Sequence, residues 1–280
     1  MLALASAFFF GAMTVALRVA LRRGDAEVGA FVTVLTAFVV VAAYAALQSA
    51  SFEARGLVVF ALTGLLAPGG SQLLFTLAVR DAGSSRTSVV VGTAPLFAVL
   101  IAIVVLHEPL RLPLALGALL VVAGGTLLAS ERARPAQFLA AGLVLAAASA
   151  LLIATRDNLV RAVSDDLHVD ASAGAATALL VGALAMLAYA AVRKPAELRA
   201  FRGWPAFVAV GILLGVSYAL LYEAYFRGRV TVVSPLVATE SLWGVGLSAL
   251  LLRRQELVGR RLFAGALLVV AGGALIGLFR

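Results

Sequence analysis

The chain has 280 residues, of which 63% are hydrophobic and 13% are charged, with a mean hydropathy of +1.07. Soluble globular proteins carry about a quarter charged residues, so this composition excludes a soluble domain of ordinary size and indicates a membrane protein. The net charge of +8 would suggest a nucleic-acid partner in a soluble protein, but here it indicates loop arginines that orient membrane spans. Cysteine is absent, which excludes disulfides and thiolate metal sites.

A membrane-spanning helix needs about 20 mostly apolar residues. The N-terminal apolar run lacks a basic leader and a convincing cleavage site, so we interpret it as the first span and not as a signal peptide. Division of the chain at its charged clusters predicts ten spans: 2–21, 28–48, 56–79, 84–106, 112–130, 136–155, 171–192, 203–226, 230–252 and 262–279. The longest connection between these spans, 156–170, is compatible with a short interfacial helix with a solvated charged face.

The sequence GALLVVAGG occurs twice, at 117–125 and 265–273, and a glutamate precedes each copy by the same spacing (Glu108 and Glu256). Such a repeat predicts a duplicated unit, with boundaries at 1–130 and 136–280. Each unit holds five spans, an odd number, so the second must enter the membrane in the opposite sense. The predicted fold is an all-α membrane protein of ten transmembrane helices, arranged as two inverted five-helix repeats around a central cavity.

The distribution of basic residues predicts an orientation. Most of the 22 Lys and Arg residues lie in the odd-numbered connections, and the positive-inside rule then places both termini outside the cytoplasm.

Two long segments resemble a known family: TAPLFAVLIAIVVLHEPLRLPLALGALLVVAGG at 93–125 and ESLWGVGLSALLLRRQELVGRRLFAGALLVVAGG at 240–273. With Phe10-Gly11 in place of a Trp-Gly pair, the chain resembles the ten-helix EamA-type branch of the drug/metabolite transporter (DMT) superfamily. Within this branch it is similar to aromatic amino acid exporters of the YddG kind. The resemblance implies an inner-membrane transporter with cytoplasmic termini, which is opposite to the orientation that the arginine distribution predicts.

Glu240 is the principal candidate for a functional group, because an ionisable residue inside a membrane is costly. Alignment of the repeats on Glu108 and Glu256 places Glu240 opposite Gly92 and Trp243 opposite Pro95. The two halves therefore differ where a substrate-specific pocket is expected. The alternative is a structural salt bridge from Glu240 to Arg86 or Arg156.

Glu223 is the second carboxylate with a possible relay role, and its alternative is an interfacial pair with Arg227. Glu108 and Glu256 are interpreted as structural, because each lies in the connection before the next helix and its charge favours that positive N-terminus. Other polar or aromatic groups in the spans are candidate lining residues, and prolines or glycines in the spans are candidate hinges. The predicted substrate-binding residues are Glu240, Trp243, Tyr218, Tyr222, Gln72, Ser71, Phe10 and Thr93; the predicted hinges are Pro68, Gly69, Pro95 and Pro235.

No catalytic triad, phosphate-binding loop or metal cluster is recognisable, so we expect neither an enzyme nor a cofactor. The predicted function is export of amino acids, aromatic or apolar ones among them, across the bacterial inner membrane by alternating access. The alternatives are transport of cationic amines or quaternary ammonium compounds, and proton-coupled drug export. The expected partners are a small-molecule substrate and membrane lipid, without nucleic acid, for a monomeric protein.

Overall fold

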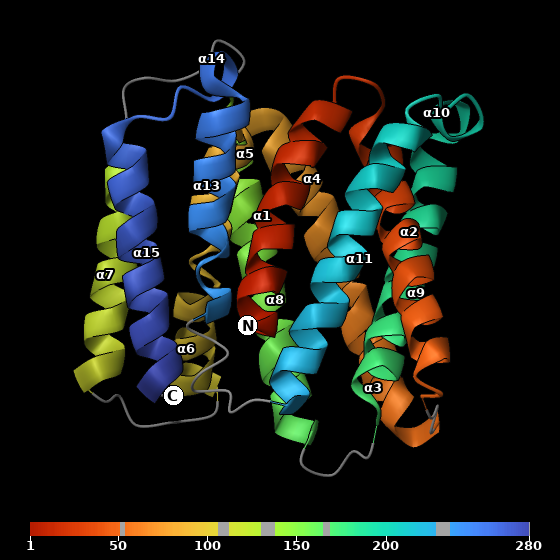
Figure 1. Ribbon diagram of the computed structural model, residues 1–280, viewed down its shortest axis with the longest axis horizontal. Coiled ribbons are helices and arrows are strands. Elements are labelled where there is room, and N and C mark those ends of the chain that lie inside the picture. The colour runs from red at the N-terminus through yellow and green to blue at the C-terminus, as the bar shows by residue number, and fades with distance from the viewer. Residues whose placement is uncertain (51–53, 106–111, 130–137, 165–168, 228–235, 280) are drawn as a thin grey trace.

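The computed structural model describes residues 1–50, 54–105, 112–129, 138–164, 169–227 and 236–279 (Figure 1). Every regular element in these residues is helical. The elements of the first half are α1 (Leu2–Ala20), α2 (Ala26–Leu47), α3 (Ala54–Gly64), η1 (Leu65–Gly70), α4 (Ser71–Ala82), α5 (Ser84–Val91), α6 (Ala94–Val105) and α7 (Leu112–Ala129). Those of the second half are α8 (Ala141–Ser164), α9 (Ala171–Arg193), α10 (Pro195–Arg199), α11 (Trp204–Arg227), α13 (Glu240–Leu251), α14 (Arg253–Glu256) and α15 (Arg260–Phe279).

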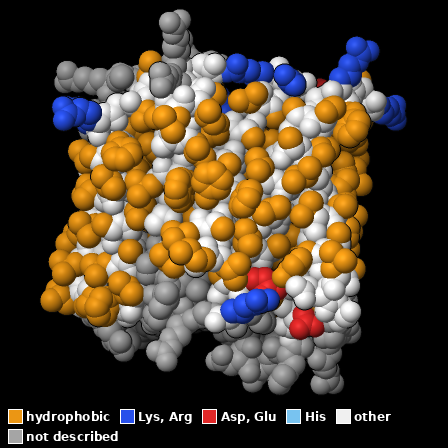
Figure 2. Space-filling view, in the orientation of Figure 1, with side chains coloured by type: hydrophobic (Ala, Val, Ile, Leu, Met, Phe, Trp, Pro, Cys, Tyr) orange, Lys and Arg blue, Asp and Glu red, His pale blue; other side chains and the backbone are white. Residues whose placement is uncertain are grey.

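The membrane character of the fold is confirmed by the lengths of these helices. Eight segments are long and apolar enough to cross a membrane, and α7 and α13 are shorter apolar helices. Figure 2 shows the resulting apolar band on the lateral surface. The helices begin where local chemistry favours it: α2, for example, follows Asp25, whose carboxylate accepts hydrogen bonds from the backbone N–H groups of Glu27 (2.9 Å) and Val28 (3.1 Å).

Several predicted spans differ in detail from the observed helices. Helix α8 continues to Ser164, so residues 156–164 extend the sixth span and do not form a separate interfacial helix. The third span is interrupted at η1, where Ala67 has non-helical backbone angles (φ −144°, ψ 119°) before Pro68. The fourth span divides into α5 and α6. Glu240 begins α13 and is therefore at a helix N-terminus, not in the middle of a continuous helix as predicted.

The two GALLVVAGG segments lie on α7 and α15, and these helices pack against each other in opposite directions (Figure 1). Gly117 faces Gly272 and Gly124 faces Gly265. A Cβ atom added at Gly117 would be 2.8 Å from the carbonyl oxygen of Gly272, and one at Gly124 would be 2.6 Å from that of Gly265. The glycine face predicted from the sequence therefore joins the equivalent helices of the two repeats in antiparallel order, as inverted repeats require.

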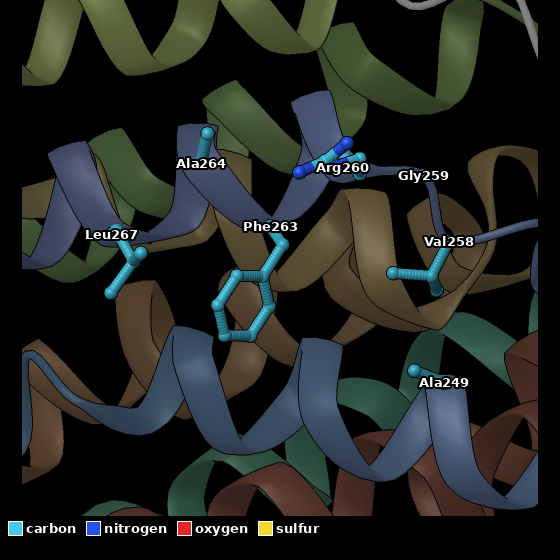
Figure 3. Close-up of a pocket in the computed structure, with 7 residues that line it drawn as sticks. All are labelled: Ala249, Val258, Gly259, Arg260, Phe263, Ala264 and Leu267. Carbon is cyan, nitrogen blue, oxygen red and sulfur yellow. The ribbon is translucent and has the colours of Figure 1, made fainter.

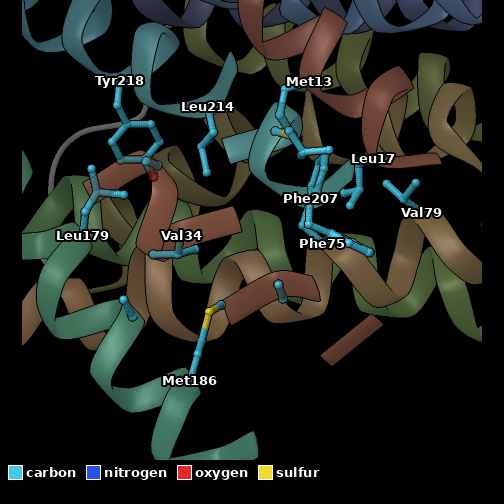
Figure 4. Packing of buried hydrophobic residues seen from close by; sticks show 14 of the residues in the cluster. Met13, Leu17, Val34, Phe75, Val79, Leu179, Met186, Phe207, Leu214 and Tyr218 are labelled. Atoms are coloured by element: carbon cyan, nitrogen blue, oxygen red, sulfur yellow. The ribbon is translucent and has the colours of Figure 1, made fainter. Parts of the chain in front are cut away.

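Other helix pairs follow the same pseudo-symmetry. The second helices of the repeats, α2 and α9, are in contact, and so are α5 and α13. The contact of α1 with α11 is matched by that of α8 with α4. The main apolar core draws on both repeats, with Met13, Leu17, Val34, Phe75, Val79, Leu179, Met186, Phe207, Leu214 and Tyr218 packed together (Figure 4). The repeats thus share one core.

Most of the exposed basic residues of the described chain lie at one end of the molecule, along the upper edge of Figures 1 and 2. They are Arg22, Arg23, Arg80, Arg193, Arg199, Arg202, Arg260 and Arg261, whereas the exposed Arg227 lies at the opposite end, where α11 ends. At the same end the Lys194 ammonium lies 3.4 Å from the Asp25 carboxylate, whose charge raises the pKa of Lys194. This asymmetry corresponds to the arginine distribution noted in the sequence.

The glycine contact gives a test with an internal control. Gly124→Ala should destabilise the protein by about 1–3 kcal/mol, because the new methyl group would overpack the α7–α15 interface. Gly125→Ala should be neutral or stabilising by up to about 1 kcal/mol, because nothing lies within 4 Å of its added Cβ and alanine favours a helix. Thermal unfolding of the purified variants in detergent measures the difference. Equal stability of the two variants would contradict the observed packing.

The inverted arrangement can be tested by labelling, because the natural chain has no cysteine. Ser49 follows α2 and Glu197 follows α9, the equivalent helix, and both are exposed. Single cysteines at these positions should react with a membrane-impermeant maleimide from opposite sides. The side from which Glu197→Cys reacts also identifies the membrane face that carries the arginines. Labelling of both positions from one side would refute the topology.

Candidate functional site

Equivalent interruptions occur in the fourth and ninth spans. The Thr93 hydroxyl donates to the carbonyl oxygen of Val90 (2.6 Å), and the Thr239 hydroxyl donates to that of Leu236 (2.6 Å). The two threonines therefore occupy corresponding turns. Interrupted helices in corresponding positions of two inverted repeats are where transporters of this architecture build their substrate sites.

These turns correct the alignment of the repeats. Thr93 corresponds to Thr239, which pairs Ala94 with Glu240 and Phe97 with Trp243. The alignment on Glu108 and Glu256 had paired Gly92 and Pro95 with these residues, and it fails here because the second repeat has the longer connection, which contains α14. The difference at Glu240 remains after the correction, whereas the difference at Trp243 is only between two aromatic rings.

Polar side chains of α8 and α11 lie together as a cluster in the interior of the fold. Tyr218 and Tyr222 on α11 are stacked, with ring centroids 6.1 Å apart. Arg156 on α8 is 8% exposed and lies within hydrogen-bonding reach of the Tyr218 hydroxyl, and its charge also acts on Tyr222. The charges of Asp157 and Glu240 act on Tyr218 as well. The structure therefore brings two predicted site residues, Tyr218 and Tyr222, together with Arg156. Glu240 acts on Tyr218 through its charge, and its direct contact with this group stays a prediction.

The two arginines considered as salt-bridge partners of Glu240 interact with other groups. Arg156 pairs with Asp157 (Nε to Oδ1, 2.7 Å), and Arg86 donates to the backbone carbonyl of Glu256 (2.8 Å). Among the described residues Glu240 has no ion-pair partner, and the charge that reaches it is the negative one of Asp157. A partly buried carboxylate in this position is available to a positively charged ligand or a proton.

Arg156 joins the candidate site in the structure, whereas the sequence suggested this residue only as a structural partner of Glu240. The usable signal was the presence of an arginine on the first helix of each repeat, Arg18 on α1 and Arg156 on α8. The two differ in the structure. Arg18 is fully engaged, as described below, whereas Nη1 of Arg156 is buried and has no hydrogen-bond partner among the described residues.

The remaining predicted lining residues are placed around the core. Gln72 is 5% exposed, and its Nε2 has no hydrogen-bond partner among the described residues. The carbonyl oxygen of Ser71 accepts a hydrogen bond from the Ser149 hydroxyl (2.9 Å). Phe10 packs edge to face on Phe75, with centroids 5.5 Å apart.

Trp243 lies at the surface and not among the tyrosines. Its side chain is 40% exposed and packs edge to face on Phe8, with ring centroids 5.3 Å apart. A direct contact of Trp243 with substrate stays a prediction.

Glu223 forms the interfacial pair that was the alternative to a relay role. Its carboxylate lies 2.6 Å from Nε of Arg227 and accepts a hydrogen bond from the Tyr44 hydroxyl (2.8 Å). Of the predicted hinges, Pro68 and Gly69 are in the interruption at η1, and Pro95 is in the first turn of α6 after the Thr93 turn. Pro235 lies outside the described residues.

Two grooves on the lateral surface are separate from this cluster. One of about 400 Å³, between α13 and α15, is lined by Phe263, Leu267 and their neighbours (Figure 3). The other, of about 520 Å³, runs between α1, α11 and α13 beside Phe8. Both are lined mainly by apolar side chains, as expected of lipid-facing surface. In the described part of the chain no three His, Asp or Glu side chains are grouped to hold a metal ion.

A second, fully buried polar network holds the basic end of the molecule. The Glu256 carboxylate is 0% exposed and accepts hydrogen bonds from the backbone N–H groups of Ser84 (3.1 Å) and Ser85 (3.2 Å) and from the Ser85 hydroxyl (2.7 Å). It also lies 3.1 Å from Nε of Arg18. Arg18 in turn donates to the carbonyl oxygens of Val79 (2.9 Å) and Arg80 (2.7 Å).

Glu256 is thus structural, as predicted, but at a different helix. It was expected to favour the helix that follows it, and it instead caps the N-terminus of α5 in the other repeat. The close approach requires glycine at position 83, where φ is +93° and an added Cβ would collide with the carboxylate. Glu108, the equivalent residue, lies outside the described residues.

Loss of the charge on Arg18 should strongly destabilise the protein. Arg18→Gln leaves the Glu256 carboxylate buried without its counter-ion, for which we expect a cost of about 3–5 kcal/mol. Lys194→Gln is the control, because its pairing with Asp25 is solvent-exposed and should contribute little to stability. Thermal unfolding in detergent compares the two variants. An Arg18→Gln protein as stable as the control would show that the buried network is not important for stability.

Comparison with known proteins agrees with this architecture. The EamA-like transporter family matches residues 1–130 and 140–278. One solved structure, described only as a crystal structure of a protein, is 21% identical, covers 98% of each chain and superposes with a TM-score of 0.65. This likeness shows the shared fold alone. No curated protein matches the chain. The chain therefore belongs to the EamA-like transporter family of the DMT superfamily, and it is a multi-pass membrane transporter and not an enzyme.

Proposed function

We propose that this transporter exports amino acids, with aromatic and apolar ones among its substrates, across the bacterial inner membrane. The observation that carries the proposal is the buried Arg156 beside the stacked rings of Tyr218 and Tyr222, with the charge of Glu240 acting on Tyr218. An amino acid carries both charges and, in this class, an apolar side chain. Glu240 is available for the substrate ammonium, because it has no ion-pair partner among the described residues.

The transport mechanism that we propose is alternating access. The two repeats pack in opposite senses through α7 and α15 and also pair α2 with α9 and α5 with α13. The interruptions at Thr93, Thr239 and η1 supply positions at which spans can bend without loss of whole helices. Rocking of one repeat relative to the other would expose the cluster to each side in turn.

Two alternatives use the same residues. A cationic amine or quaternary ammonium compound would use Glu240 and the aromatic rings, but it would leave buried Arg156 without a role. A proton-coupled drug exporter would use Glu240 to exchange a proton for the drug. The likeness to aromatic amino acid exporters of the YddG kind, the monomeric state and the division at 1–130 and 136–280 are further parts of our proposal.

Counterflow in proteoliposomes distinguishes these functions. Vesicles loaded with unlabelled substrate should accumulate labelled phenylalanine, and threonine to a lesser extent, but not labelled choline. Exchange of choline alone would support the cationic alternative. Exchange of none of the three, with uptake of a drug driven by a proton gradient, would support the drug exporter.

The role of Glu240 can be tested separately. Glu240→Gln removes a charge-assisted contact of about 1.5–3 kcal/mol, so phenylalanine exchange should fall about 10- to 150-fold while the protein remains monodisperse. Glu197→Gln, a change of the same kind on the exposed helix α10, is the control. Unchanged exchange in Glu240→Gln would remove this residue from the site, and a protein that no longer folds would instead indicate a structural role.

A further inference from the structure

Arg156 differs from every other arginine whose environment is described near the membrane interior. Its side chain is 10% exposed, and its only ion pair among the described residues joins Nε to the neighbouring Asp157. The Asp157 side chain is 53% exposed, so the pair reaches from the interior towards the surface. The buried Nη1 nitrogen is left without a hydrogen-bond partner in this part of the chain. An orphaned guanidinium N–H inside a protein is a position prepared for an acceptor.

Arg18, on the first helix of the first repeat, shows how a buried guanidinium is satisfied when its role is structural. Arg18 pairs with the Glu256 carboxylate through Nε, and its Nη1 donates to two backbone carbonyls at the end of α4. Arg156 is on α8, the first helix of the second repeat, but its fork of donors is only partly used. The two buried arginines therefore differ in how many of their donors are engaged.

We infer that Arg156 is the carboxylate-binding subsite of the transporter and that its ligands are zwitterionic α-amino acids held between Arg156 and Glu240. The free Nη1 would donate to one carboxylate oxygen, and the nearby Tyr218 hydroxyl would donate to the same group. Guanidinium suits this task because its planar N–H groups match the geometry of a carboxylate. Glu240, which shares the electrostatic neighbourhood of Tyr218, would hold the ammonium.

This inference deepens the proposed function and rests on it for the placement of the substrate. It adds a requirement that the function alone does not contain: a ligand must carry a carboxylate. Phenethylamine is phenylalanine without the carboxylate, and 3-phenylpropionate is phenylalanine without the ammonium. These two compounds therefore probe the two ends of the site one at a time.

The experiment combines competition with ligand-induced thermal stabilisation. Phenylalanine should compete in counterflow, phenethylamine should compete about tenfold or more weakly, and both phenylalanine and 3-phenylpropionate should raise the unfolding temperature. Arg156→Gln should lose the stabilisation by 3-phenylpropionate and the preference for phenylalanine over phenethylamine. Arg156→Lys, which keeps the charge without the fork, should retain part of both effects and serves if the Gln variant does not fold.

Arg80→Gln is the matched control. Arg80 pairs with the adjacent Asp81 through Nε (2.6 Å), as Arg156 does with Asp157, but its side chain is 50% exposed. This variant should behave like the natural protein towards all three compounds.

The outcomes separate the inference from the proposed function. Exchange of phenylalanine with equal competition by phenethylamine, or an unchanged preference in the Arg156 variants, overturns the inference and leaves the function standing. Absence of phenylalanine exchange, with Arg156-dependent binding of 3-phenylpropionate, supports the carboxylate subsite and overturns the proposed substrate. Binding of no carboxylate to the natural protein overturns the inference directly.

Discussion

The burial of the Glu256 carboxylate constrains the basic end of the molecule more than any other single interaction. A charge removed from water is tolerated only if ion pairs and hydrogen bonds replace its hydration. Glu256 obtains these from Arg18 and from the first turn of α5. Since Arg18 also binds the last carbonyls of α4, one network fixes α1, α4, α5 and the connection before α15. The ends of four spans from two repeats are thereby held in a single arrangement.

The rest of the architecture follows from close packing between equivalent helices. Lipid offers little hydrophobic drive for helix association, so small residues and backbone contacts must hold the repeats together. The repeated glycines do this at α7 and α15. In the proposed function, substrate binding depends on differences between the repeats. Glu240 stands where the first repeat has Ala94, and Arg156 keeps an N–H without a partner among the described residues, whereas Arg18 is engaged. An amino acid carries an ammonium and a carboxylate, and Glu240 and Arg156 could each bind one of these groups.

The sequence predicted the membrane class, the ten spans and the inverted repeat because each depends on composition and period alone. It also predicted the glycine face, since two glycines seven residues apart share a helix surface. The extension of α8 was missed because Arg156 and Asp157 resemble a loop, although their charges neutralise each other in the helix. The cap on α5 was misplaced because hydropathy does not show which helices of different repeats meet. The alignment at Thr239 failed because identical GALLVVAGG segments gave no information on the length of the connection before them.

The central claim is that substrate binds beside Tyr218, between Arg156 and Glu240. A crystal structure with 4-bromophenylalanine tests this most directly, because the anomalous signal of bromine locates the ligand without interpretation of its shape. The account predicts a bromine peak near the stacked rings of Tyr218 and Tyr222, with the carboxylate of the amino acid at Arg156. A peak confined to the lateral groove beside Phe8, with the Arg156 and Glu240 side chains unoccupied, would contradict it.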